Sequence, residues 1–241
     1  MSTISENIKT VRSRIAAAAE RSGRDEKDIE LICVTKTRTV EEIKEAIEAG
    51  VVQLGENRVQ ELMEKYDKIQ DIANTMHKKP NIMWNLIGHL QRNKIKYVAG
   101  KVALIHSVDS FKLAEEINAR QSKIGEPSHV LIQLNAGDES QKSGVSFDDC
   151  EALADLIDES LPYVQLNGLM VVVPIVDNPE DVRGYFRDAK KMFDKLAAKR
   201  LDGNKGFRHL SMGMTHDFEV AVEEGATIVR VGTAIFGPRS I

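Results

Sequence analysis

One lysine of this sequence, Lys36, stands at the end of an apolar run, where an amine could do chemistry. The stretch LICVTKT, residues 31–37, has the aliphatic and β-branched composition of a buried strand. Because side chains alternate along a strand, Ile32, Val34 and Lys36 share one face. If that face points into a barrel, Lys36 lies at its carboxyl end, where a partly desolvated amine near other cations has a lowered pKa and can form a Schiff base. The alternative is a lysine that simply reaches water as its strand ends.

A second charged residue lies inside an apolar strand pattern near the carboxyl terminus. In TIVRVGTAIFG, residues 227–237, Arg230 shares a face with Ile228 and Gly232. Arginine keeps its charge, so a buried guanidinium must find an acceptor. That acceptor is either a core carboxylate or an atom of a bound ligand.

Two glycine-containing turns follow the last two apolar runs. Gly232 and Thr233 form one of them, and Ser211-Met212-Gly213 is a similar element at the end of the preceding strand, which makes Ser211 and Gly213 candidate cofactor-binding residues. In barrels of alternating strands and helices, the loops after strands seven and eight commonly bind phosphate, although such turns are also frequent in ordinary loops. An amine, a buried arginine and a phosphate cradle together match pyridoxal 5′-phosphate, which carries an aldehyde, a pyridine nitrogen and a phosphate.

The elements that must position these residues are short apolar runs alternating with amphipathic stretches. This pattern is typical of βα units around a parallel sheet. The sequence predicts strands near 29–36, 51–55, 82–87, 102–107, 129–135, 164–173, 207–211 and 227–232. It predicts helices near 5–21, 39–49, 56–73, 90–99, 110–123, 146–160, 179–201 and 215–224. We expect an α/β fold, a single (β/α)8 TIM barrel domain over residues 1–241 with an extra amino-terminal helix; a doubly wound sheet is the alternative.

Local signals support several of these helix boundaries. Thr39 followed by Glu42 predicts a capping box at the start of one helix. Gly50 and Gly225 stand where a helix commonly ends on a left-handed residue.

Composition limits the class of partner. The net charge of −4 is spread along the chain without a basic stripe, so we expect no nucleic acid partner. Cys33 and Cys150 form no CxxC motif and the histidines lack metal-site spacing, so we expect no disulfide and no metal. The longest apolar stretch, residues 169–176, is too short to span a bilayer, and we expect a cytoplasmic protein.

Motifs along nearly the whole chain carry a family resemblance. They are VTKT around Lys36, GENRVQE at 55–61, WNLIGHLQRNK at 84–94, HSVD at 106–109, QKSG at 141–144, LMVVVP at 169–174 and SMGMTHDFEVAVEEGATIVRVGTAIFG at 211–237. In these segments the sequence resembles the pyridoxal phosphate homeostasis protein family, single-domain relatives of the alanine racemase barrel. It departs from the commoner wording at Gly88-His89-Leu90, Gln91-Arg92-Asn93 and Thr215-His216, which leaves loop contacts at the mouth open.

The resemblance implies a cofactor site and a role in the cell. It implies an aldimine on Lys36, Arg230 against the pyridine nitrogen, Asn57 lining the pocket, and phosphate contacts from Ser211, Gly232 and Thr233. It also implies a protein that holds pyridoxal phosphate and passes it on to PLP-dependent apoenzymes. By analogy we expect a monomer.

Chemical reasoning favours binding over turnover. A cation such as Arg230 beside the pyridine nitrogen disfavours its protonation and weakens the ring as an electron sink. Racemisation needs an acid or base on each face of the substrate, and the racemases take one from an additional carboxyl-terminal domain that we do not expect after Ile241. We therefore expect no strong catalysis. The alternatives are a PLP-dependent amino-acid racemase or lyase, and a cofactor-free Schiff-base aldolase or phosphosugar isomerase.

Overall fold

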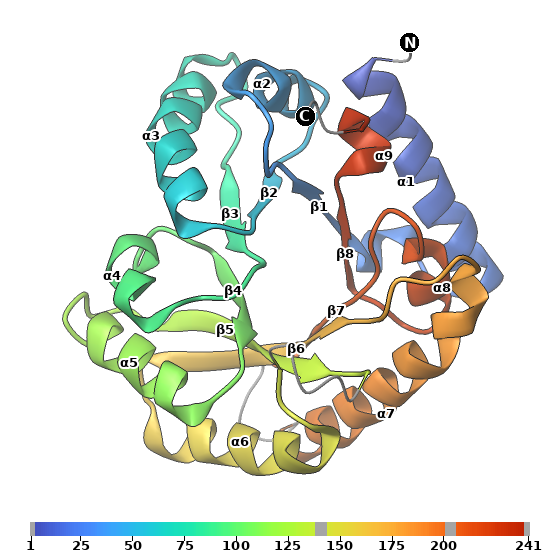
Figure 1. The fold of residues 1–241 in the computed structure, drawn as a ribbon. Coiled ribbons are helices and arrows are strands. Elements are labelled where there is room, and N and C mark those ends of the chain that lie inside the picture. Colours follow the sequence, from blue (N-terminus) through green and yellow to red (C-terminus); the bar gives the residue numbers. More distant parts are fainter. Residues whose placement is uncertain (1–2, 138–143, 201–205, 239–241) are drawn as a thin grey trace.

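Eight parallel strands close into a barrel with helices on its outside (Figure 1). The computed structural model describes residues 3–137, 144–200 and 206–238, so the first three residues of the QKSG motif lie outside the described part. The strands are β1 (Glu30–Val34), β2 (Gln53–Glu56), β3 (Met83–Leu86), β4 (Leu104–Val108), β5 (Ser128–Asn135), β6 (Val164–Val172), β7 (His209–Ser211) and β8 (Ile228–Val231). Each strand pairs with the next one in the chain, and β8 pairs with β1. The predicted TIM barrel is confirmed.

The helices follow the predicted order, with an amino-terminal helix before the first strand. They are α1 (Ile4–Arg21), α2 (Val40–Glu48), α3 (Val59–Thr75), α4 (Ile95–Val98), α5 (Phe111–Gln121), α6 (Phe147–Ser160), α7 (Arg183–Lys199), α8 (Phe218–Glu223) and α9 (Thr233–Phe236). The predicted helix at 179–201 begins as the 3-10 turn η3 (Pro179–Val182), and the one at 90–99 includes η2 (Arg92–Lys94). The short η1 (Glu26–Asp28) and α9 were not predicted.

Helix ends form where the sequence places capping groups. The Thr39 hydroxyl accepts a hydrogen bond from the backbone N–H of Glu42, whose side chain accepts one from the N–H of Thr39, so the predicted capping box is confirmed. After α2 and α8 the chain turns through Gly50 (φ +91°) and Gly225 (φ +100°), conformations that side chains with a Cβ disfavour.

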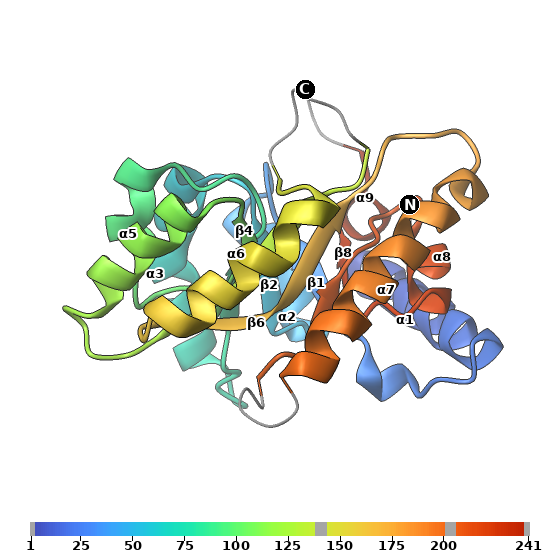
Figure 2. The same cartoon turned by 90° about the horizontal axis from the view of Figure 1, so that it is seen from below.

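The strands separate two apolar cores, as their alternation requires. Inside the barrel a small cluster packs together, formed by Ile32, Leu104, Leu131, Met170 and Ile228. Outside it, a larger core fills the space between the strands and the helices and includes Cys33 and Trp84. Ile32 therefore lies on the inward face, which is the condition under which Lys36 lies at the carboxyl end of the barrel. In both views α6 and α7 lie on the outside of the barrel (Figures 1 and 2).

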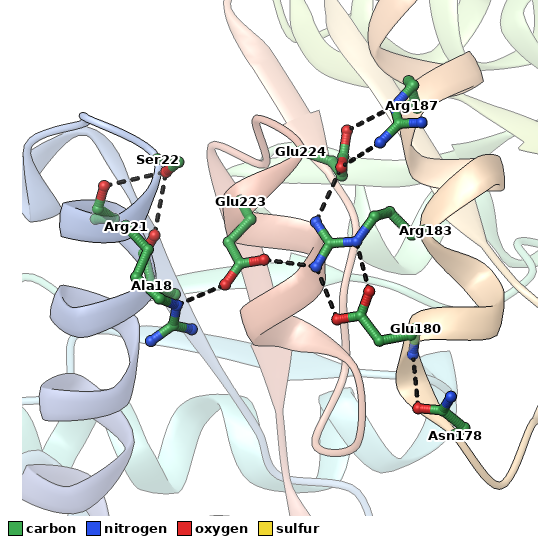
Figure 3. Close-up of polar contacts among 10 residues, drawn as sticks. Ala18, Arg21, Ser22, Asn178, Glu180, Arg183, Arg187, Glu223 and Glu224 are labelled. Atoms are coloured by element: carbon green, nitrogen blue, oxygen red, sulfur yellow. Dashed lines mark hydrogen bonds and ion pairs between the residues drawn. The ribbon is translucent and has the colours of Figure 1, made fainter.

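An ion-pair network joins three outer helices (Figure 3). Arg183 of α7 contacts Glu223 at 2.6 Å and Glu224 at 2.9 Å, both at the end of α8. Arg21 of α1 contacts Glu223 from the other side at 2.7 Å. The network therefore fastens the amino-terminal helix to the last units of the barrel.

The described residues also bear on two kinds of partner, a membrane and a metal ion. Within residues 3–137, 144–200 and 206–238, no helix has the length and apolar character needed to cross a membrane. The same residues contain no group of three or more histidine, cysteine or acidic side chains placed to hold a metal ion.

Candidate functional site

Lys36 lies in the turn directly after β1, at the carboxyl end of the barrel, and is partly buried. The register between β1 and β8 pairs Ile32 with Arg230, so Lys36 stands four residues beyond the level of Arg230. A Cβ on Gly232 would lie 3.3 Å from the Cβ of Val34, which places this glycine one layer above Arg230. The lysine, the arginine and the glycine turn therefore occupy successive levels of the same two neighbouring strands.

Arg230 is buried, with 4% of its surface exposed, and its guanidinium is bonded to neutral oxygens. Its Nη1 donates to Oγ of Ser211 at 2.7 Å, and its Nη2 donates to the carbonyl oxygen of Val171 at 2.9 Å. Burial lowers the pKa of Arg230 to about 10, while the nearby carboxyl of Asp217 opposes the shift. At neutral pH the guanidinium is still a cation, and it points into the barrel without a directly bonded carboxylate among these contacts.

A chain of polar side chains continues beneath Arg230. Nδ1 of His106 lies 3.0 Å from Oγ of Ser211, and its Nε2 lies 3.4 Å from Oδ1 of Asn85. Burial and the neighbouring Arg230 hold the pKa of His106 well below its usual value of 6.5, so the ring is neutral. Asn85 in turn donates to Oε1 of Gln53 at 2.9 Å. The interior of the barrel thus fixes the orientation of Arg230 through a hydrogen-bonded network.

Ser211, predicted as a phosphate ligand, is fully buried. Its hydroxyl already accepts from Arg230 and contacts His106. Direct contact between this hydroxyl and a phosphate stays a prediction. In the structure, Ser211 links the buried Arg230 to the polar network below it.

The two predicted glycine turns lie side by side at the mouth. The backbone N–H of Arg230 donates to the carbonyl oxygen of Gly213 at 3.0 Å, which joins the end of β7 to β8. Gly213 adopts φ +91°, and a Cβ there would lie 2.6 Å from the Cβ of Ala221, so only glycine fits without displacement. The N–H of Ala234 faces Oγ1 of Thr215 at 3.4 Å, which brings Thr215 to the Gly232-Thr233 turn.

Asn57 lies in the loop after β2 and lines a cavity of about 330 Å³ at the same end of the barrel. Its Oδ1 is buried and has no hydrogen-bond partner among the described residues. Gly88 packs against it, since a Cβ on Gly88 would lie 2.3 Å from the carbonyl oxygen of Asn57. An orphaned buried oxygen at the rim is a group that a polar ligand would satisfy.

A larger cavity, of about 1070 Å³, opens at the opposite, amino-terminal end of the strands. His209 and Glu30 line it together with His129 and Arg208. His209 shares the inward face of Ser211, yet it lies at the end of the barrel away from Lys36. It is therefore poorly placed to act as an acid or base on a ligand held there.

Sequence reasoning missed Thr215 at this site and Lys65, which contacts the residue before Lys36 from the outer side of the barrel. Thr215 was noted only as a departure from the family wording. Lys65 was not considered, although it follows Leu62 by three residues and precedes Ile69 by four, which places a charge on the buried face of α3. A charged residue at that spacing was the signal available.

The residues present fit pyridoxal phosphate. The site offers an amine at the rim, a buried cation below it, two glycine turns with a threonine hydroxyl, and the unsatisfied oxygen of Asn57. The amine suits the aldehyde of the cofactor, the buried cation suits its pyridine nitrogen, and the turns with the threonine hydroxyl suit its phosphate.

Comparison with known proteins agrees with this geometry. The family model described as alanine racemase, N-terminal domain, matches residues 2–240. A pyridoxal phosphate homeostasis protein of Aquifex aeolicus is 45% identical over 97% of this chain and 97% of its own length. A structure of an unknown protein from Bifidobacterium adolescentis has a TM-score of 0.88 with 38% identity, covering 96% of this chain and 94% of that chain.

A structure with bound cofactor is also similar. PipY of Synechococcus elongatus PCC7942, solved with PLP bound, has a TM-score of 0.79 with 32% identity, and covers 98% of this chain and 100% of that chain. These matches cover nearly the full length of this chain and of each matched chain. The chain therefore belongs to the pyridoxal phosphate homeostasis protein family, on the fold of the alanine racemase amino-terminal domain.

Proposed function

We propose that this protein binds pyridoxal 5′-phosphate at Lys36, keeps its reactive aldehyde sequestered, and delivers the cofactor without strong turnover of its own. The proposal rests on Arg230, a buried cation below Lys36. The two hydrogen bonds of its guanidinium go to neutral oxygens. The structure of PipY with PLP bound and the relatives named pyridoxal phosphate homeostasis protein support the same cofactor.

Each residue has a distinct part in holding the cofactor. When bound, pyridoxal phosphate supplies an aldehyde that can be joined covalently to an amine. We assign that amine to Lys36, the partner of the pyridine nitrogen to Arg230, and the phosphate contacts to the adjoining turns at Gly213 and Gly232-Thr233. The hydroxyl of Thr215 lies beside the second turn and adds to the phosphate site.

Arg230 also limits the chemistry. Its pKa, about 10, keeps it positive at neutral pH. A cation disfavours protonation of a nearby pyridine nitrogen, so the ring withdraws less electron density than it would beside a carboxylate. This supports the assignment of a carrier or regulator, and not an enzyme.

The wider setting of this function is part of the same proposal. We propose that residues 1–241 act as one domain, that the protein works as a monomer in the cytoplasm, and that PLP-dependent apoenzymes receive the cofactor. Asn57 would contact the cofactor from the β2 side of Lys36, whereas Arg230 lies on the β8 side. The Oδ1 of Asn57 has no partner among the described residues.

A racemase or lyase activity is the second candidate, because the chain shares its fold with alanine racemase. The two are separated by mixing the cofactor-loaded protein with D- and L-amino acids and following product over many turnovers. The carrier predicts no sustained turnover, together with transfer of the cofactor to an added apoenzyme. Sustained turnover that is lost in Lys36→Ala, and kept in the exposed control Lys44→Ala, would replace the carrier with the enzyme.

A further inference from the structure

A buried lysine on the outer side of the barrel contacts the turn that carries Lys36. Lys65 of α3 is 7% exposed, and its Nζ lies 2.7 Å from the carbonyl oxygen of Thr35, from Oε1 of Glu56 and from Oε1 of Glu61. Three acceptors match the three donors of an ammonium group. None of these residues lines the cavity beside Asn57 at the mouth.

The same three side chains hold both residues that flank Lys36. Before Lys36, the carbonyl oxygen of Thr35 accepts a hydrogen bond from Nζ of Lys65. The hydroxyl of Thr35 donates to Oε1 of Glu56 at 2.7 Å. After Lys36, the backbone N–H of Thr37 donates to Oε1 of Glu61. The Lys36 peptide is therefore fixed on its amino side and on its carboxyl side by one buried ionic cluster.

The conformation held in this way is a strained one. Thr37 has φ +64°, in the left-handed region that a β-branched residue rarely adopts. Such a conformation persists only where surrounding contacts enforce it. The turn is closed by the backbone N–H of Arg38, which donates to the carbonyl oxygen of Thr35 at 3.0 Å. The bond from Thr37 to Glu61, which Lys65 orients, anchors Thr37 itself.

The charges of the cluster depend on one another. Burial raises the pKa of Glu56, while its bonds to Lys65 and Thr35 oppose the shift. Burial acts in the same direction on Glu61, but its bonds from Lys65 and Thr37 outweigh it and lower the pKa. Oε2 of Glu56 is buried without a hydrogen-bond partner among the described residues. Lys65 is thus the cation that keeps two carboxylates in place behind the turn.

We infer that Lys65 is a positioning residue: together with Glu56 and Glu61 it holds the 35–37 turn, with its left-handed Thr37, in the conformation that presents the Lys36 amine to pyridoxal phosphate. This inference rests on the proposed function for the identity of the ligand. The conformation of the turn itself does not depend on the ligand.

The test compares Lys65→Met with Lys68→Met, a control on the exposed side of the same helix. Lys65→Met should weaken pyridoxal phosphate binding about tenfold, the equivalent of one lost charged hydrogen bond, and Lys68→Met should bind like the wild type. In the cofactor-free protein, Lys65→Met should accelerate amide hydrogen exchange of residues 35–38 without changing exchange in the β5 and β6 strands. A loss of exchange protection throughout the barrel would show a general structural role and overturn the inference.

A second variant separates positioning from packing. Asparagine tolerates the left-handed region better than threonine, so Thr37→Asn added to Lys65→Met should restore part of the lost affinity. Lys65→Met with wild-type affinity, or weakened affinity that Thr37→Asn does not improve, contradicts the inference. If Lys65→Met does not fold, Glu61→Ala removes the Thr37 anchor and one of the three acceptors of Lys65, and must show the same local exchange and weaker binding. Should the wild type itself bind no pyridoxal phosphate, the proposed function fails, and the exchange measurement on the apoprotein still decides the positioning.

Discussion

The guanidinium of Arg230 donates a 2.7 Å hydrogen bond to the hydroxyl of Ser211, which also lies 3.0 Å from Nδ1 of His106. The residue proposed to meet the pyridine nitrogen and a residue predicted to meet the phosphate are therefore parts of one buried network. We therefore expect a change at Ser211 to act on the proposed cofactor contact through the orientation of Arg230. The two effects can be separated by the choice of ligand.

Removing the buried cation should weaken cofactor binding. Arg230→Ala would leave the pyridine nitrogen without its proposed donor, and we expect a loss of about 1–3 kcal/mol in binding free energy. Titration of the apoprotein with pyridoxal phosphate measures it. Arg208→Ala, at the amino-terminal end of the barrel, is the control and should leave the affinity for pyridoxal phosphate unchanged. Equal affinity in Arg230→Ala and the wild type would remove Arg230 from the site.

Pyridoxal, which lacks the phosphate, distinguishes the roles of Ser211 and Thr233. Thr233→Val should lower the affinity for pyridoxal phosphate by about 1 kcal/mol, one neutral hydrogen bond, and leave pyridoxal unaffected. Ser211→Ala should weaken both ligands alike, because it acts through Arg230. If Ser211→Ala weakens pyridoxal phosphate alone, its hydroxyl is a direct phosphate ligand, as the sequence resemblance implies.

The histidines lining the barrel predict a loss of stability in mild acid. Burial and the nearby Arg208 lower the pKa of His209 from 6.5 to about 4, and this outweighs the 3.9 Å contact with Glu30. The unfolded chain then binds a proton more readily than the folded one below pH 6.5. The free energy of unfolding is unaffected above that pH and falls below it, by up to about 1.4 kcal/mol per pH unit, until pH 4 is reached.

Urea unfolding between pH 7 and pH 4.5 measures this effect. His209→Gln should lose less stability than the wild type as the pH falls, whereas the exposed control His77→Gln should follow the wild type. A difference between His209→Gln and the wild type that stays constant with pH would show that His209 is not the titrating group.

The ion-pair network between α1, α8 and α7 should contribute modestly to stability. Arg183→Ala removes the pairs with Glu223 and Glu224, and we expect a loss of about 1 kcal/mol at pH 7. Burial raises the pKa of both carboxyls, but their arginine bonds outweigh it and lower both values. Their contribution is therefore complete above the ordinary glutamate pKa and is lost as the pH falls through the lowered values.

Thermal unfolding at pH 7 and pH 3 compares Arg183→Ala with Lys191→Ala, a lysine that pairs with the exposed Asp188. Arg183→Ala should unfold at a lower temperature than Lys191→Ala at pH 7, and this difference should narrow at pH 3. A gap of equal size at both pH values would mean that packing, and not charge, is lost with Arg183.

Much of the barrel follows from local rules that a sequence displays. The alternation of Ile32 and Cys33 predicts one residue inside the strands and one outside, and the structure has them there. The capping box at Thr39 and the glycine after α2 fix helix ends through contacts within a few residues. Short elements such as α9, with four residues, have too few positions to show a periodic pattern.

The network beneath the site could not be predicted in the same way. Ser211 and His106 are 105 residues apart, and their contact depends on how eight strands close. The turn at Ser211 was recognised, but the direction of its hydroxyl was not, because a turn sequence does not determine which neighbour a hydroxyl meets. Lys65 presented a visible anomaly on an apolar helix face, but its partners Thr35 and Glu56 become neighbours only in the folded barrel.

The proposed function requires that pyridoxal phosphate is joined covalently to the amine of Lys36. The most direct measurement is borohydride reduction of the protein after incubation with the cofactor, followed by mass spectrometry of its peptides. We predict one added cofactor on the peptide containing Lys36, accompanied by a visible absorption band before reduction, and neither in Lys36→Ala. An unmodified Lys36 peptide after incubation with excess cofactor, or a label carried only by exposed lysines such as Lys44, would contradict the claim.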